Sequence, residues 1–212
     1  MECEKIQVID CGLLEYDQTL GLQIEFWQNL QKEKTGNTVL LVEHPDVITL
    51  GARNTENKLL ASGKQLKQKG IELHRIGRGG GTTAHNPGQI VMYPMINLKS
   101  IGSDVPAYVR SLESIGIELL DELGVQSQRR KGYPGLWVGE KKIASIGVQI
   151  KKWITMHGMA INIQNDLGIF DYIIPCGIEG VVMTSVLNET GIEQSIEEIK
   201  HTLTELCFKQ WG

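Results

Sequence analysis

The order of apolar segments along this 212-residue chain constrains its fold more than any other feature. Three segments, which begin at Tyr16, Asp104 and Ser195, repeat their apolar residues at the 3.6-residue period of a helix. Strands and helices do not alternate regularly, which disfavours a doubly wound parallel sheet. We therefore predict an α+β fold in which residues 1–212 form a single domain, a mixed β-sheet flanked by helices. The predicted strands are short, apolar and rich in β-branched residues: 6–9, 38–45, 47–51, 71–76, 89–98, 135–150 and 153–163.

The composition excludes several broad classes of protein. A net charge of −4 disfavours a general nucleic-acid binder, and 41% apolar residues disfavour intrinsic disorder. No apolar stretch approaches the roughly 18 residues of a membrane helix, and residues 1–4 do not begin a signal peptide. We therefore expect a cytoplasmic protein that does not bind membranes. No C-x-x-C pair occurs, so neither a metal site nor a disulfide is expected from the cysteines, which are Cys3, Cys11, Cys176 and Cys207.

Glycine is enriched: it accounts for 24 of the 212 residues, or about 11%, against a usual share of roughly 7%. Three consecutive glycines, Gly79 to Gly81, directly follow Arg78 at the end of a predicted strand. Glycine lets the backbone approach a ligand closely, so that its N–H groups can face an anion or a carbonyl oxygen. We interpret the segment as a binding loop, with a flexible turn as the alternative, because polar side chains crowd around it: Thr82, Thr83, His85, Asn86 and Gln89.

Two residues are candidates for acid–base and nucleophilic chemistry. Lys142 shares one face of a predicted strand with Ala144, Ile146 and Val148 if side chains alternate regularly. Burial on such a face would favour the neutral amine, which can accept a proton; a solvated lysine at a strand edge is the alternative. Cys176 lies in a loop between Pro175 and Gly177, where free N–H groups could stabilise an oxyanion beside a nucleophilic thiol.

The histidines leave a further possibility open. His44, His85 and His157 lie at predicted strand ends or bends, where they could form a Cys–His hydrolytic dyad with Cys176. No spacing rule selects one of them. Cys207, by contrast, lies on the apolar stripe of the C-terminal helix and is expected to fill the core.

Four motifs in the same order resemble the lipoyl(octanoyl) transferase family. The glycine-loop pattern of that family appears here as RGGGTTAHNPGQ (78–89), and its lysine signature appears as GLWVGEKKIASIG (135–147). Its H-G-x-A-x-N pattern appears as HGMAIN (157–162), and its P-C-G pattern as residues 175–177, followed by MTS (183–185). The resemblance extends from EHP (43–45) to MTSVL (183–187), which is most of the chain.

This resemblance implies a fold similar to the catalytic module of biotin and lipoate ligases, and a Cys–Lys dyad. Cys176 would take an octanoyl group from the phosphopantetheine arm of acyl carrier protein, and Lys142 would act as the base. No cofactor or metal beyond that arm is implied. The acceptors would be lysines in lipoyl domains of 2-oxoacid dehydrogenase complexes and in the glycine cleavage H protein, and the enzyme would be a monomer. The acyl channel would be lined by Arg78, Gly79, Gly80, Gly81, Thr82, Thr83, Ala84, His85, Ser145, Ile146, Gly147, Gly158, Met159 and Ala160.

The sequence departs from the family pattern at Gly81, Ala84 and Asn86. These positions fall in the implied acyl-binding region, so the preferred chain length is left open. An ATP-dependent lipoate–protein ligase is the closest alternative function, although that chemistry does not require the cysteine of the P-C-G motif. A non-catalytic module that binds acyl groups or carrier proteins is another alternative.

The charge distribution supports one further hypothesis about partners. Residues 129–152 hold seven basic residues against one acidic residue, Glu140, which gives this segment a net charge of +6. A basic rim around Lys142 could attract acidic carrier proteins and lipoyl domains.

Overall fold

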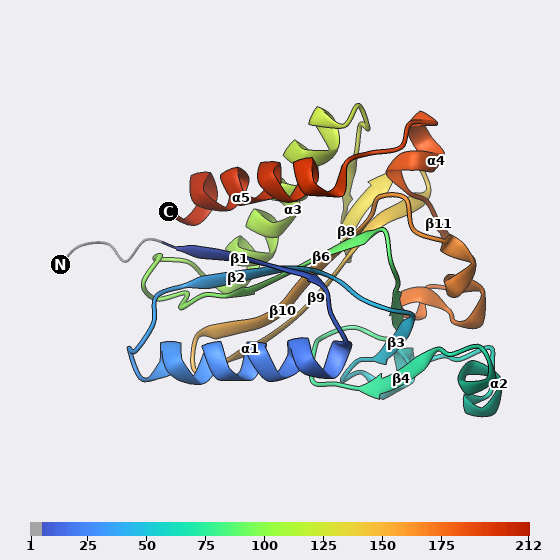
Figure 1. Ribbon diagram of the computed structural model, residues 1–212, viewed down its shortest axis with the longest axis horizontal. Coiled ribbons are helices and arrows are strands. Elements are labelled where there is room, and N and C mark those ends of the chain that lie inside the picture. The colour runs from blue at the N-terminus through green and yellow to red at the C-terminus, as the bar shows by residue number, and fades with distance from the viewer. Residues whose placement is uncertain (1–5) are drawn as a thin grey trace.

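A large mixed β-sheet forms the centre of the computed structural model, which describes residues 6–212 (Figure 1). Cys3 lies outside the described residues. β1 pairs with β2 in parallel, as does β11 with β9, whereas the other neighbours in this sheet are antiparallel. The strands run in the spatial order β1 (Gln7–Leu13), β2 (Thr38–Glu43), β6 (Gln89–Met95), β10 (Ile154–Asn162), β9 (Lys141–Lys151), β8 (Tyr133–Val138) and β7 (Gln128–Arg130), with β11 (Val182–Met183) also beside β9.

A second, smaller sheet lies at one end of the large one (Figure 1). Its order is β4 (Glu72–Arg75), β3 (Val47–Leu50) and β5 (Thr83–His85), and the short helix α2 (Gly63–Gln68) leads into β4. The glycine loop connects β4 to β5. This loop is therefore held between the two sheets.

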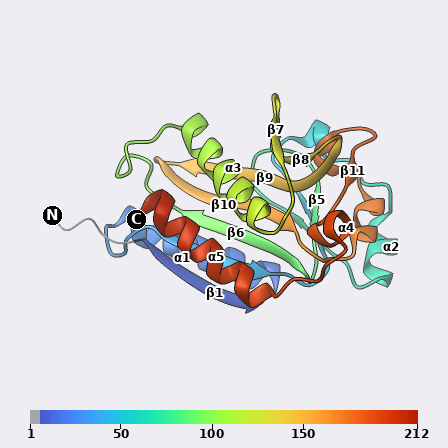
Figure 2. The ribbon, with the colours of Figure 1, turned by 90° about the horizontal axis from the view of Figure 1, so that it is seen from above.

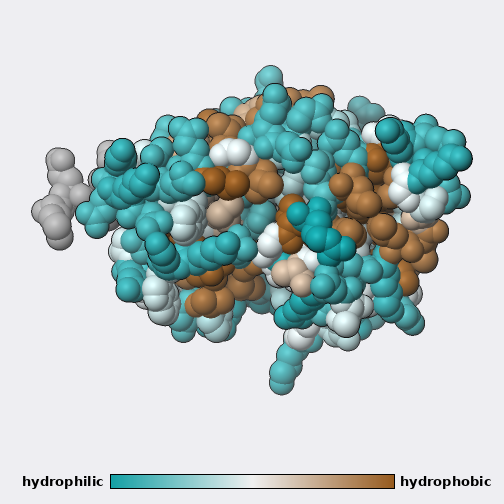
Figure 3. Space-filling model, turned by 90° about the horizontal axis from the view of Figure 1, so that it is seen from below, coloured by the Kyte–Doolittle hydropathy of each residue, from teal (hydrophilic) through white to brown (hydrophobic). Residues whose placement is uncertain are grey.

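Helices cover both faces of the large sheet. α3 (Val105–Glu122) and α5 (Ile196–Trp211) pack side by side on one face, and α1 (Tyr16–Gln31) covers the other (Figures 1 and 2). The helix α4 (Val186–Thr190) follows β11. Seen from the side that carries α1 and β4, the surface is mainly hydrophilic with separate apolar patches (Figure 3). The arrangement confirms the predicted α+β fold with a mixed sheet between helices.

Local signals in the sequence place the helix ends. Asp104 accepts a hydrogen bond from the N–H of Ala107 at 2.7 Å, and Ser195 caps α5 through the N–H of Glu198 at 3.3 Å. The first helix ends at Gln31, and Glu33 adopts a left-handed φ of 55° just beyond it. None of the helices in residues 6–212 combines the length and the apolarity needed to cross a bilayer.

The largest core cluster lies between the sheet and the pair α3 and α5. Cys207 belongs to this cluster and is fully buried, which confirms its predicted place in the core. The predicted regular alternation around Lys142 is wrong. Trp137 pairs with Lys142 while Leu136 pairs with Ala144, so Ile143 is an extra residue that forms a bulge in β9.

Candidate active site

The side chains of Lys142 and Cys176 meet at the edge of the large sheet. The Lys142 Nζ lies 3.5 Å from the Cys176 Sγ and donates a second hydrogen bond to the carbonyl of Pro134 at 3.1 Å. It also lies 5.3 Å from the centre of the Trp137 ring. Lys142 is only 1% exposed, whereas Cys176 is half-buried. The lysine is therefore fixed in the interior, and the thiol is the member of the pair that a substrate can reach.

Backbone hydrogen bonds hold these two residues together. The strand β11, which follows the cysteine turn, pairs with Lys141 and Lys142 at the start of β9. The N–H of Thr184 donates to the carbonyl of Lys142 at 2.9 Å, and the N–H of Cys176 donates to the carbonyl of Thr82 at 2.8 Å. Three segments that are distant in the sequence are thus joined at the dyad: the glycine loop, β9 and the cysteine turn.

The turn around Cys176 does not offer the free N–H groups that the sequence suggested. It is a 3-10 turn, Pro175–Gly177, in which Cys176 adopts a left-handed φ of 55°. The N–H of Gly177 donates to Ile174 at 3.1 Å, and the N–H of Ile178 donates to Pro175 at 3.0 Å. Since the N–H of Cys176 is also bonded, that prediction is wrong, and an oxyanion at this thiol needs other donors.

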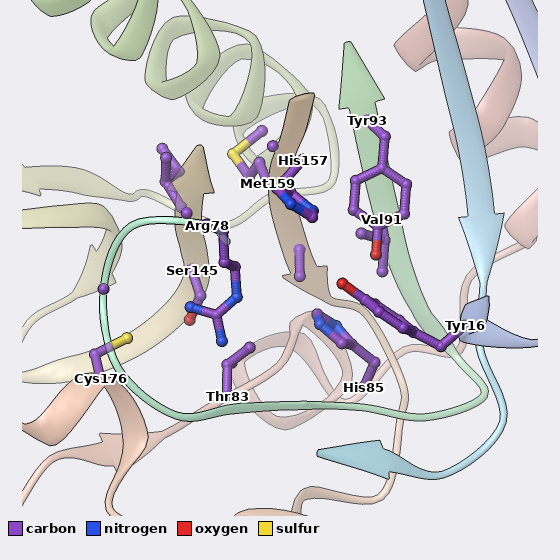
Figure 4. Close-up of a pocket in the computed structure, with 15 residues that line it drawn as sticks. Tyr16, Arg78, Thr83, His85, Val91, Tyr93, Ser145, His157, Met159 and Cys176 are labelled. Atoms are coloured by element: carbon purple, nitrogen blue, oxygen red, sulfur yellow. The ribbon is translucent and has the colours of Figure 1, made fainter. Parts of the chain in front are cut away.

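A pocket leads from Cys176 into the interior between the two sheets and the start of α1 (Figure 4). Its cavity volume is about 30 Å³, which is below the usual size range of small-molecule sites, so the pocket is narrow. Ten of the predicted channel residues line it: Arg78, Gly80, Thr83, His85, Ser145, Ile146, Gly147, Gly158, Met159 and Ala160. The sequence reasoning missed Tyr16, Val91 and Tyr93 and left His157 open, and these four residues also line the pocket.

The histidines around the pocket are neutral. Burial lowers the pKa of His44 and of His157 to about 4, and that of His85 to about 3. The His44 ring bonds to the Tyr93 hydroxyl at 2.9 Å, and the His85 ring bonds to the Gln89 side chain at 2.7 Å. None of these partners is Cys176, and the described hydrogen bonds place Lys142, not a histidine, beside the thiol.

One cation, Arg78, reaches into this neutral pocket. Its guanidinium donates to the carbonyl and the hydroxyl of Thr49 at 3.0 and 2.8 Å, and to the carbonyl of Gly79 at 3.1 Å. Arg78 is 7% exposed. The side chain is therefore rigidly held at the wall of the pocket. The described residues 6–212 contain no group of His, Cys, Asp or Glu side chains arranged to hold a metal ion.

Sequence similarity to known proteins extends over nearly the whole chain. A model of the lipoyl protein ligase A/B catalytic domain matches residues 15–207. An octanoyltransferase of Flavobacterium johnsoniae is 41% identical, covering 96% of this chain and 97% of its own. Another, from Caldicellulosiruptor saccharolyticus, is 38% identical over 98% of this chain and 89% of its own. The chain belongs to the octanoyltransferase family. It is therefore an acyltransferase, as the motifs predicted.

Solved structures of more distant proteins share the fold of this octanoyltransferase family member. Lipoate-protein ligase A bound with ATP superposes with a TM-score of 0.77 at 16% identity, over 97% of this chain and 84% of the ligase. Biotin protein ligase from Aquifex aeolicus with biotin and ATP gives a TM-score of 0.56 at 14% identity, over 97% and 70% of the two chains. The predicted likeness to the catalytic module of these ligases is confirmed for the fold.

Four predicted channel residues of this octanoyltransferase family member lie outside the pocket. Gly79 faces the open groove on the other side of Cys176, and Gly81 packs against the backbone of Glu56. Thr82 is fully buried, and its carbonyl holds the cysteine turn. Ala84 belongs to the core of the small sheet.

The positions that depart from the family pattern are therefore not in the pocket wall. Gly81 and Ala84 lie outside it, and Asn86 bonds to the carbonyl of Asp166 at 2.8 Å and to the side chain of Asn165 at 2.9 Å. Of the three, Asn86 ties its own loop to the segment that holds Asn165 and Asp166.

The basic segment 129–152 does not form a continuous positive face. Arg129 pairs with Glu113 at 3.0 Å, and Arg130 pairs with Glu140 at 2.9 Å. Lys141 pairs with Glu189, and Lys142 is buried. Lys151 is the last residue of the strand β9 and Lys152 follows it, so both lie about 30 Å from Lys142 at the usual rise of a strand. Among the exposed basic residues of this segment, only Lys131 lies at the groove without an ion pair in residues 6–212.

Proposed function

We propose that this acyltransferase moves an octanoyl group from octanoyl-acyl carrier protein to a lysine of a lipoyl domain, through a thioester on Cys176. The observation that carries this proposal is the 3.5 Å contact between the Cys176 Sγ and the buried Lys142 nitrogen. A nucleophile and a proton-accepting group within hydrogen-bonding reach are the signature of covalent acyl transfer. The similarity to octanoyltransferases supports the identity of the acyl group.

In the first half of the reaction, the thiol proton of Cys176 passes to the Lys142 amine. The thiolate attacks the carbonyl carbon of the donor thioester, and a new C–S bond forms while the C=O π electrons move to oxygen. When this adduct collapses, the bond to the carrier sulfur breaks, and the leaving thiolate takes the proton back from the Lys142 ammonium. The carbonyl of Pro134, 3.1 Å from the nitrogen, stabilises that ammonium while it exists.

In the second half, the amine of the acceptor lysine attacks the octanoyl–Cys176 thioester. Lys142, now neutral, accepts the proton that this amine must lose, and an amide forms as the Cys176 thiolate departs. One base therefore serves both halves, and its protonation state after the first half is the one that the second half requires.

The two openings beside Cys176 match the two parts of the donor. The narrow pocket has the small residues Gly147, Gly158 and Ala160 in its wall, and an alkyl chain would enter beside them by widening it. The open groove, which Lys142 and Cys176 both line, can admit the arm of the carrier protein and later the acceptor lysine.

We further propose that the protein acts as a cytoplasmic monomer and needs no cofactor other than the phosphopantetheine of its donor. The acceptors would be lipoyl domains of 2-oxoacid dehydrogenase complexes and the glycine cleavage H protein.

Mass spectrometry of the protein mixed with octanoyl-acyl carrier protein, without ATP, tests this proposal. We expect a mass gain of one octanoyl group, absent in Cys176→Ala and retained in Cys207→Ala, whose thiol is buried in the core. Lys142→Met should slow formation of the adduct by about 100-fold or more, the usual contribution of a general base. No adduct on the unsubstituted protein, together with ATP-dependent attachment of free lipoate to a lipoyl domain, would instead establish a ligase.

A further inference from the structure

The guanidinium of Arg78 is a buried charge that lacks an anionic partner. Arg78 is 7% exposed, and it takes part in none of the ion pairs formed by residues 6–212. Removing an ion from water carries a large desolvation cost, which proteins normally offset with an opposite charge. An unpaired buried cation therefore indicates that an anion forms beside it during function.

The hydrogen bonds of Arg78 leave part of its donor capacity unused. A guanidinium has five N–H donors, and here three bonds run to neutral oxygens of Thr49 and Gly79. The Nε–H is buried and makes no hydrogen bond in the described structure. The three bonds fix the orientation of the group, and one Nη1–H remains for a ligand.

The surroundings hold the guanidinium at the Cys176 end of the pocket. Arg78 and Cys176 line the same pocket, and the close-up shows the guanidinium between Cys176 and the Tyr16–His85 pair (Figure 4). Glycines border the arginine: a Cβ at Gly147 would lie 2.9 Å from its Cδ, and one at Gly51 would lie 3.0 Å from its Nη1. Burial lowers the pKa of Arg78, and Cys176, when its thiol is ionised, is the largest influence that raises it.

The cysteine turn cannot supply an oxyanion hole from its own backbone. The N–H groups of Cys176, Gly177 and Ile178 are all bonded within the protein. Addition of a thiolate to a thioester nevertheless places a full negative charge on the former carbonyl oxygen, which hydrogen-bond donors and cations stabilise in active sites. The unpaired cation and the missing donors lie at the same end of the same pocket.

We propose that Arg78 is a catalytic residue that donates its free Nη1–H to the oxyanion formed at Cys176 in each half-reaction. The C–S bond forms, the C=O π electrons move to oxygen, and the guanidinium balances that charge until the leaving group departs. No proton is transferred to or from Arg78. The inference rests on the proposed acyl transfer through Cys176 and adds the group that stabilises its intermediates.

A heptyl trifluoromethyl ketone, which imitates octanoyl, is a suitable probe. A thiolate adds to such a ketone to give a stable hemithioketal whose oxygen is negatively charged, so its affinity reports on oxyanion stabilisation. We expect Arg78→Gln to weaken inhibition by the ketone about 100- to 1,000-fold, the usual effect of losing one oxyanion donor. In a Cys176→Ala background, the same substitution should change the affinity for octanoyl-acyl carrier protein less than about threefold. Equal losses in both measurements would overturn the inference and leave Arg78 as a part of the pocket wall.

A second variant guards against a folding defect in Arg78→Gln. Thr49→Val removes the hydroxyl acceptor at 2.8 Å but keeps the arginine and its charge. We expect this variant to weaken inhibition by the ketone about tenfold. In the Cys176→Ala background, its affinity for the octanoyl donor should be unchanged. An unaltered ketone affinity would count against a positioned guanidinium. Failure of the unsubstituted protein to form the octanoyl adduct at all would instead refute the proposed function.

Discussion

Mild acid should destabilise this enzyme because three buried histidines must remain neutral in the native state. Burial lowers the pKa of His44 and His157 to about 4 and that of His85 to about 3, whereas unfolded histidines titrate near 6.5. Between these values the unfolded chain binds protons that the native protein excludes, so the free energy of unfolding falls as the pH falls. This stability is fully present above about pH 6.5 and is lost progressively toward pH 4.

The magnitude follows from linkage. At pH 5, each unfolded histidine is about 1.5 pH units below its own pKa, and each unit corresponds to about 1.36 kcal/mol. Each buried histidine therefore costs about 2 kcal/mol of stability at pH 5, and the three together cost about 6 kcal/mol. Because a domain has only about 5–15 kcal/mol in total, a large part of the native stability should disappear over this range.

Replacement of one histidine separates its effect from that of the carboxyl groups. His157 has a left-handed φ of 57°, a conformation that asparagine tolerates, so His157→Asn preserves the backbone. The free energy of unfolding can be measured by urea unfolding, followed by tryptophan fluorescence, at pH 7.5 and at pH 5. Its decrease between the two pH values should be about 2 kcal/mol smaller in this variant than in the unsubstituted protein. The control is His201→Asn, which removes an imidazole exposed on α5 that folding does not desolvate. If His157→Asn loses as much stability on acidification as the unsubstituted protein does, the reasoning from burial is wrong.

Three further substitutions test the placement of the glycine loop and of the helices. In Gly51→Ala the new Cβ would overlap the carbonyl of Gly80, which should displace the loop and slow octanoyl-adduct formation about 100-fold in single-turnover assays. Gly21→Ala meets no atom within 4 Å in the middle of α1, and should raise the free energy of unfolding by about 0.5–1 kcal/mol without changing that rate. Asp104→Ala removes the cap of α3 and should lower the free energy of unfolding by about 1 kcal/mol in urea titrations, again with unchanged adduct formation.

Features that depend on neighbouring residues could be predicted from the sequence. The caps at Asp104 and Ser195 each involve a hydrogen bond between residues three positions apart, so residue type and spacing identify them. Most strands followed from their apolar β-branched runs, but the predicted strand 135–150 is two strands, β8 and β9, and β5, β7 and β11 were missed. The bulge at Ile143 was missed as well, because nothing in the spacing marks it. The order of the motifs was specific enough to identify the family before any contact was known.

Features that depend on distant residues could not be predicted in this way. Tyr16 comes from the start of α1 and Tyr93 from β6, and only the packing of α1 on the sheet brings them to one pocket. Arg129 and Lys141 are neutralised by the ion pairs Arg129–Glu113 and Lys141–Glu189. The net charge summed over residues 129–152 cannot show this, because both acidic partners lie outside that segment. The bonded N–H groups around Cys176 depend on the closure of the turn, which residue types alone do not determine.

The position of Cys176 between a closed pocket and an open groove has a consequence for the kinetics. With the octanoyl tail in the pocket, the thioester can be approached only from the groove, so the proposed donor and acceptor proteins must use one entrance in succession. The spent carrier has to leave before a lipoyl domain can reach the acyl group. Turnover should then show parallel double-reciprocal lines, and an excess of unloaded carrier protein should compete with the lipoyl domain for the acylated enzyme.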